Sequence, residues 1–323
     1  MHYRDNVDYP PLLTRPVVYL PLLGGLFAAL VAMNAGGGAF GRLTSSVFPA
    51  VQDGTQLNVL TAALVTLLAG FNIFVVLRLP LRQQVWLVWG ELALLILLFF
   101  YSFDLSFVFI RRKIGFLLSQ GLVTTLYISA ISIVIATVLA MIGAVAKLSS
   151  NGIALGIANF YTSLFRGLPL LMQIYMIYLG LPQLGYVVDA VPTGIAALSL
   201  CYGAYMTEIF RAGIESIPKG QWEASRALGM RPAAVMTRII LPQSMRVIIP
   251  PTGNQFISML KDSSLVSVVG VWELMYLART QGQTEFRHVE MMITASLIYW
   301  MLSIVLELVQ KMIEKHYNKS VTR

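Results

Sequence analysis

The chain has 323 residues, of which 57% are hydrophobic and only 12% are charged. Soluble domains carry about 25% charged residues, so this composition excludes a water-soluble globular enzyme and a disordered or collagen-like chain. Cys201 is the single cysteine, which rules out an intrachain disulfide and a cysteine-based metal site. The net charge of +8 is better explained by basic cytoplasmic loops than by nucleic-acid binding. We therefore predict an all-α protein that crosses the lipid bilayer several times.

Eight stretches with few or no charges are long enough to cross a bilayer, which takes about 20 apolar residues in a helix. In chain order they cover about 17–33, 57–77, 85–109, 122–146, 168–188, 191–210, 247–271 and 291–309. We place a boundary near residue 113. Residues 1–113 then form an N-terminal extension with three transmembrane helices, and residues 114–323 form a core with five.

An even number of crossings puts both termini on one side of the membrane. Lys and Arg are far more numerous in the segments that share the side of the termini than in the others. Because cytoplasmic loops collect these residues, the bias predicts that both termini are cytoplasmic. The cluster Arg111, Arg112 and Lys113 falls on the outer side and opposes the bias.

The longest polar connection, residues 211–246, is predicted to hold two short helices. The first, at 221–228, ends at Gly229, a residue type that suits the left-handed conformation found after helices. The second, at 233–241, is predicted to end at Pro242, because proline breaks helical hydrogen bonding. From the residues alone, this loop either docks another protein or merely connects two spans.

The same stretch carries a gapped motif. It consists of Glu223, Ala224, Ser225, Gly229, Leu241 and Pro242, with Ile239 two residues before Leu241. This resembles the EAA loop of the permease subunits of ABC importers, in which E-A-A is followed by three residues, G, nine residues and I-x-L-P. Ser225 in place of the second alanine is the one departure.

The flanking segments resemble the polar amino-acid branch of these permeases, the histidine, glutamine and glutamate type. They are Gly121 to Leu126, Arg166 to Gln173, Ala204 to Arg211 and Lys261 to Leu265. The resemblance covers roughly residues 114–320 and implies a five-helix permease core in the bacterial inner membrane. The extension at 1–113 has no inferred role beyond extra packing surface.

The resemblance implies that the six motif residues couple the chain to two separate ATP-binding subunits. It further implies a second permease subunit, more often a different one than a copy, and an external solute-binding protein that delivers a polar amino acid. The chain itself is not expected to be an enzyme or to hold a cofactor or metal. None of its lysines follows a glycine, so the sequence has no Walker A motif, and ATP and Mg are expected on the partners.

Lys261 and Asp262 interrupt the seventh predicted span near its middle, where charged side chains are costly and usually functional. Helix neighbours lie about 100° apart, so each needs its own partner. They serve either as a structural brace or in gating. Glu208 is three residues from Arg211, which predicts an ion pair; the resemblance adds the alternative that Glu208 meets the substrate ammonium group. Gln173 and Asn254 are weaker candidates, which either line the substrate pathway or bridge helices.

Two other classes of function stay open at this point. One is a secondary amino-acid transporter or channel driven by an ion gradient. Such proteins often contain inverted sequence repeats, and the sequence shows none. The other is a non-transporting anchor or sensor that docks an ATPase. An anchor would tolerate loss of Lys261 and Asp262, whereas a transporter would not.

Overall fold

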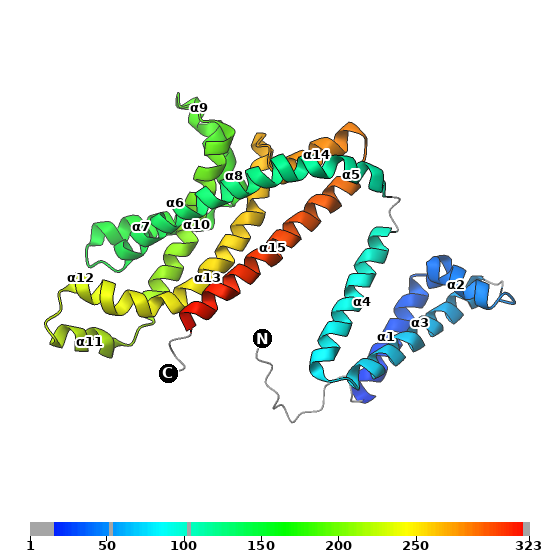
Figure 1. Cartoon of the computed structure of the whole chain (residues 1–323). Coiled ribbons are helices and arrows are strands. Elements are labelled where there is room, and N and C mark those ends of the chain that lie inside the picture. Colours follow the sequence, from blue (N-terminus) through cyan, green and yellow to red (C-terminus); the bar gives the residue numbers. More distant parts are fainter. Residues whose placement is uncertain (1–15, 52–53, 102–104, 319–323) are drawn as a thin grey trace. The chain divides into compact units, whose positions relative to one another are not determined.

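The computed structural model describes residues 16–51, 54–101 and 105–318 (Figure 1). All regular elements of these described residues are helical, which confirms the predicted all-α class. The chain forms two compact units, unit 1 (Met1–Asp104) and unit 2 (Leu105–Arg323).

Unit 1 is a small helical bundle. Its elements are α1 (Pro16–Ala32), η2 (Ala35–Gly37), α2 (Ala39–Val47), α3 (Gly54–Leu77) and α4 (Leu81–Tyr101). α1 packs along α3, where the Tyr19 hydroxyl donates a 2.5 Å hydrogen bond to the Gly70 carbonyl. Asn58 of α3 holds the turn after α1, since its Nδ2 donates to the Val31 carbonyl at 2.9 Å and its Oδ1 accepts from the Gly36 amide at 3.1 Å. These bonds tie the glycine-rich turn to α3.

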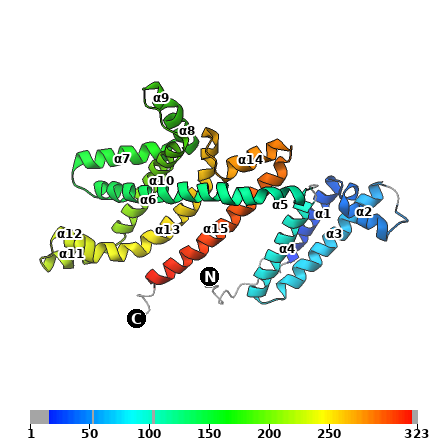
Figure 2. The ribbon, with the colours of Figure 1, turned by 45° about the horizontal axis from the view of Figure 1, so that its top comes forward.

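Unit 2 begins with a continuous helix of 41 residues, Phe107–Lys147. It comprises α5 (Phe107–Phe116), the π-helical turn η3 (Leu117–Leu122) and α6 (Val123–Lys147). The elements that follow are α7 (Gly152–Gly167), α8 (Leu170–Tyr175), η4 (Met176–Gly180), α9 (Leu181–Gln183), α10 (Ala190–Glu215), α11 (Lys219–Ala227), α12 (Pro232–Ala234), η5 (Val235–Ile240), α13 (Leu241–Asp262), η6 (Ser263–Val269), α14 (Leu274–Thr284) and α15 (His288–Asn318). Within unit 2, α11 and α12 lie at the end opposite α14 (Figures 1 and 2).

The central helix of unit 2 is α10, which packs against α6, α7 and α13. Glycines bring its neighbours close: a Cβ added to Gly194 would lie 2.3 Å from Val266 Cγ1, and one added to Gly213 would lie 2.4 Å from Ile248 Cγ1. Small residues at such contacts let membrane helices approach closely, which matters because lipid supplies no hydrophobic drive between helices.

By length and composition, three helices of the described residues are able to cross a membrane: Gly54–Leu77, Phe107–Lys147 and His288–Tyr317. A bent pair, Gly152–Gly167 with Leu170–Gln183, makes a fourth if it is one span, and its halves meet at 105°. The predicted count of eight spans is therefore not confirmed. The sequence prediction also missed α7, because its polar residues interrupt the apolar run.

Two predicted spans have the wrong extent. The span at 85–109 is not one helix, since α4 ends at Tyr101 and α5 starts at Phe107; residues 102–104 between them lie outside the described residues. The span at 247–271 is α-helical only to Asp262 and continues as the 3-10 turn η6. A run of apolar residues predicts a span but does not reveal where its helical geometry changes.

The basic cluster at residues 111–113 lies in the first turns of the 41-residue helix. Arg112 and Lys113 both form ion pairs with Glu285, directly after α14. At about 1.5 Å per residue, this helix is roughly twice as long as the hydrocarbon core is thick, so its first turns need not enter the core. The cluster therefore begins a long helix beside α14 and does not end a third span.

Candidate coupling and substrate sites

The first helix of the EAA loop is α11, and it ends as the sequence predicts. Gly229 has φ +72°, in the left-handed region. Its amide donates to the Arg226 carbonyl at 2.9 Å, and the Met230 amide donates to the Ser225 carbonyl at 3.2 Å. These two bonds form a Schellman cap, which satisfies carbonyls that a helix end leaves free.

The second helix of the loop does not end at Pro242, so that prediction is wrong. The chain stays helical from Pro232 to Asp262, passing through the π-helical turn η5 and on into α13. A π-turn pairs each amide with the carbonyl five residues earlier, and the change back to α-helix leaves room for a residue without an amide donor. Pro242 occupies that place, as the second residue of α13, and is exposed.

The loop has one face against the protein and one free face. Trp222 and Met230 pack on the apolar cluster formed by the end of α10, η5 and the first half of α13. Ser225 is 4% exposed and donates from its Oγ to the Gln221 carbonyl at 2.6 Å. The other motif residues of α11, Glu223 and Ala224, are exposed, and so is Leu228 at 81%. Leu241 is half-buried in α13.

A cavity of about 420 Å³ lies where the break between α7 and α8 meets α10 and α13. Arg166 from the end of α7 and Asp262 from the end of α13 line it, together with Tyr202, Tyr205 and Gln255. The Tyr202 hydroxyl donates a 2.7 Å hydrogen bond to Asp262 Oδ2. The cavity thus combines one cation, one anion and two aromatic rings in a volume suited to a small ligand.

Lys261 and Asp262 face different spaces, which is expected because neighbouring residues on a helix point about 100° apart. Lys261 lines a second groove of about 530 Å³ between α13 and α15, with Asn254 and Glu307. Asn254 Oδ1 accepts a 3.1 Å hydrogen bond from Gln310 of α15. Both residues lie in the last turn of α13, after which the chain continues as η6.

Glu208 of α10 lies among three cations. Arg211 Nε is 3.0 Å from Glu208 Oε2, which confirms the ion pair that their spacing predicts. Lys147 from α6 pairs with Oε1 of the same carboxylate, and Arg166 Nη1 lies 3.5 Å from that oxygen. Lys147 and Arg166 are contacts that the sequence analysis missed.

Gln173 does not line the cavity but supports its wall. It is 3% exposed, and its Nε2 donates to the carbonyls of Phe165 and Leu168, both at 2.9 Å. These carbonyls lie at the break between α7 and α8, where regular helical bonding stops. Gln173 therefore stabilises the bend next to Arg166.

A family model, described as the binding-protein-dependent transport system inner membrane component, matches residues 136–319. The chain belongs to this family. The matched range includes the cavity, the cluster around Glu208 and the EAA loop, and the predicted identification of a permease subunit is confirmed.

Two relatives of this permease come from Bacillus subtilis. The arginine transport system permease protein ArtQ is 38% identical over 213 residues, which cover 66% of this chain and 97% of ArtQ. The L-cystine transport system permease protein TcyB is 38% identical over 208 residues, covering 64% of this chain and 89% of TcyB. A solved amino acid ABC transporter with histidines is 32% identical, with a TM-score of 0.62, and covers 66% of this chain and 99% of its own.

One buried acid of the permease was not anticipated from its sequence. Glu273 is fully buried ahead of α14 and accepts hydrogen bonds from the Met275 and Tyr276 amides at 2.8 and 2.7 Å. The Tyr299 hydroxyl donates to it as well, at 2.8 Å. Burial raises the pKa of Glu273 to about 7, although these hydrogen bonds act in the opposite direction. In the described part of the permease, no group of three His, Cys, Asp or Glu is placed to hold a metal ion.

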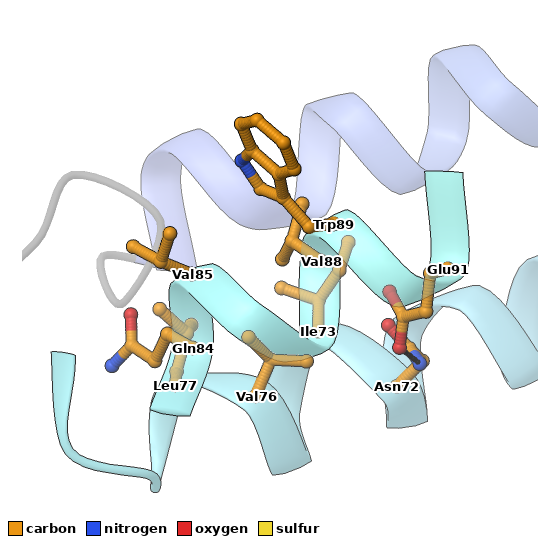
Figure 3. A pocket seen from close by; sticks show the side chains of 9 residues that line it. All are labelled: Asn72, Ile73, Val76, Leu77, Gln84, Val85, Val88, Trp89 and Glu91. Carbon is orange, nitrogen blue, oxygen red and sulfur yellow. Dashed lines mark hydrogen bonds between the residues drawn. The ribbon is translucent and has the colours of Figure 1, made fainter. Parts of the chain in front are cut away.

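A separate groove of about 490 Å³ lies in unit 1 between α3 and α4. Figure 3 shows Asn72 and Glu91 turned toward each other at one end of it, and Asn72 Nδ2 donates to Glu91 Oε1 at 2.7 Å. Most of the remaining lining is apolar, including Val88 and Trp89. The hydrogen bond satisfies part of a carboxylate in a helix that the sequence predicts to lie in the membrane.

Proposed function

We propose that this permease is the membrane subunit of an ATP-driven importer for polar amino acids. The main support is the cavity in unit 2, because Arg166 and Asp262 both line it and can bind one small ligand. A free amino acid is a zwitterion that carries one group for each. The transport-system names of the relatives, one for arginine and one for L-cystine, support the same substrate class.

In this proposal Arg166 binds the substrate carboxylate and Asp262 binds the ammonium group. A guanidinium presents a planar fork of donors that matches a carboxylate. Tyr202 holds the Asp262 side chain through its 2.7 Å hydrogen bond, and the Tyr205 ring lies 5.5 Å from the Arg166 guanidinium carbon. Pairing both charges offsets the cost of taking a zwitterion out of water.

The EAA loop supplies the attachment to the motor in this proposal. The exposed side of α11, with Glu223, Ala224 and Leu228, docks on one of two ATP-binding subunits, which hold ATP and Mg. Ser225 and Gly229 act from the opposite side, by seating and ending the helix. Closing of the ATPase pair then moves α10 and α13, which flank the loop, and alternates access to the cavity.

The assembly follows from the same proposal. A second permease subunit, more often a different chain than a copy, completes the pathway, and an external solute-binding protein delivers the substrate. In this proposal residues 114–323, which make up unit 2 together with residues 105–113, form the transporting core in the inner membrane. Residues 1–113 add three further transmembrane helices. Both termini lie in the cytoplasm, on the side of the EAA loop.

The test is uptake of labelled L-amino acids by the transporter reconstituted with its ATP-binding and solute-binding subunits. Asp262→Asn should raise the KM about tenfold or more, because a hydrogen-bonded ion pair to the ammonium group is lost. Asp189→Asn makes the same change of charge at an exposed residue outside the cavity and should leave the KM within about twofold. Normal KM values for Asp262→Asn, or no ATP-dependent uptake of any amino acid by the wild type, would contradict the proposal.

A further inference from the structure

Two cations compete for one oxygen of Glu208. Lys147 and Arg166 both contact Oε1, whereas Arg211 takes Oε2. The Arg166 contact, at 3.5 Å, is longer than the 3.0 Å contact of Arg211. The Arg166 side chain is also 43% exposed, against 9% for Lys147. Arg166 is therefore the most weakly held of the three cations.

Arg166 also borders the substrate cavity, so a single guanidinium lies between two possible anions. It lines the cavity together with Asp262 and stands beside the Tyr205 ring. The Tyr205 hydroxyl in turn donates to the Arg166 carbonyl at 3.5 Å. A guanidinium has five donors, but it cannot present its fork fully to a ligand carboxylate while part of it faces Glu208.

The other side of the Glu208 cluster leads to the EAA loop. Leu148 follows Lys147 at the end of α6, and Ile209 and Phe210 follow Glu208 in α10. All three pack on the apolar cluster that also seats Trp222 and Met230 of the loop. The side chains that contact the loop are thus direct chain neighbours of the ion cluster.

We propose that Arg166 is a substrate-responsive switch between the cavity and the EAA loop. A carboxylate that enters the cavity draws the guanidinium away from Glu208, which leaves Lys147 and Arg211 to hold the carboxylate of Glu208. The ends of α6 and α10 then change their mutual contacts, and the apolar cluster passes this change to α11. By reciprocity, a change at the loop that weakens the contact between Arg166 and Glu208 increases the affinity for the carboxylate. This inference rests on the proposed function.

The decisive comparison is between an amino acid and the amine that lacks its carboxylate. The probes are L-arginine, L-histidine and L-glutamine, with agmatine, histamine and 4-aminobutanamide as their decarboxylated counterparts. The reconstituted transporter is assayed for KM and for stimulation of ATPase activity by each probe. The amino acid that the wild type imports best, with its amine, is then used for the variants.

Glu208→Gln should lower the KM for the amino acid about two- to fivefold, the size of a partly exposed ion pair, and should reduce stimulation of the ATPase by substrate. Lys147→Gln removes the competitor for Oε1 and should change the KM in the opposite direction. Neither change should move the KM for the amine. The matched control Glu285→Gln removes one carboxylate that contacts neither Arg166 nor Glu208 and should leave both values unchanged.

A double-mutant cycle separates the switch from a general electrostatic field. In an Arg166→Gln background, Glu208→Gln should no longer change the KM, because its effect passes through Arg166. An equal effect in both backgrounds, or equal effects on amine and amino acid, would overturn the switch while leaving amino-acid import intact. Failure of the wild type to import any amino acid would instead overturn the proposed function itself.

Discussion

Substitution of Gly229 tests whether the angle at which α11 is held matters for coupling. Gly229 has φ +72°, and no atom lies within 4 Å of a Cβ placed there. A new side chain therefore meets open space, and its cost comes from the backbone alone. An L-residue in the left-handed region costs roughly 1–2 kcal/mol, asparagine is tolerated best, and a β-branched residue is tolerated worst.

These costs set a rank order for the variants. Coupling should fall from glycine to Gly229→Asn, then Gly229→Ala, then Gly229→Val. A cost of 1–2 kcal/mol lowers the population of the capped loop about five- to thirtyfold, if opening of the cap is the least costly way for the loop to unfold. The Schellman bonds at 2.9 and 3.2 Å are the contacts that would be lost.

The assay is the number of substrate molecules imported per ATP hydrolysed by the reconstituted transporter, together with the affinity for its ATP-binding subunit. Gly220→Ala is the matched control, because Gly220 lies inside α11, also faces open space and has an ordinary φ. Alanine favours helix by up to about 1 kcal/mol, so this variant should couple at least as well as the wild type. Equal coupling in the alanine, valine and asparagine variants of Gly229 would refute the argument.

Two further predictions concern stability. The pKa of Glu273 is raised to about 7 in the folded protein, so the stability it contributes is present at low pH and is lost as the pH rises through about 7. The unfolding temperature in detergent should therefore fall between about pH 5 and about pH 8. It can be followed with a thiol-reactive dye that labels the buried Cys201 once the protein unfolds. Glu273→Gln should make the unfolding temperature depend less on pH. Gly194→Ala places a methyl group 2.3 Å from Val266 and should lower the free energy of unfolding by about 1–3 kcal/mol. Gly156→Ala is the control, because its methyl group faces open space and should not destabilise the protein. The same thermal assay distinguishes the two variants.

The parts of the EAA loop that depend on local chemistry could be predicted from sequence. The end of α11 at Gly229 follows from the left-handed conformation that glycine adopts easily, and this requires no knowledge of the rest of the fold. The same local reasoning failed at Pro242, because the rule that proline breaks a helix assumes regular α-helical bonding. The π-turn at Val235–Ile240 changes that bonding, and the local sequence does not predict a π-turn.

The candidate substrate site shows the same division. The pair of Glu208 and Arg211 is visible in the sequence because three residues make nearly one helical turn. Lys147 lies 61 residues from Glu208 in the sequence and reaches it only because α6 packs along α10. The sequence left Gln173 open as a residue that lines the pathway or one that bridges helices. In the structure its buried amide donates to two carbonyls at the bend, since broken backbone bonding needs a donor there.

Three of the residues that carry the proposals lie where a regular helix stops. Arg166 lies at the end of α7, Asp262 lies in the last turn of α13, and Gly229 directly follows the C-cap residue of α11. A helix interior satisfies its own backbone, whereas the last turn of a helix leaves carbonyl groups without a partner inside the helix. In a membrane such ends are tolerated only where protein or a polar cavity surrounds them. The same breaks that make the spans hard to delimit from the sequence therefore place the charges where a substrate and a motor can both act on them.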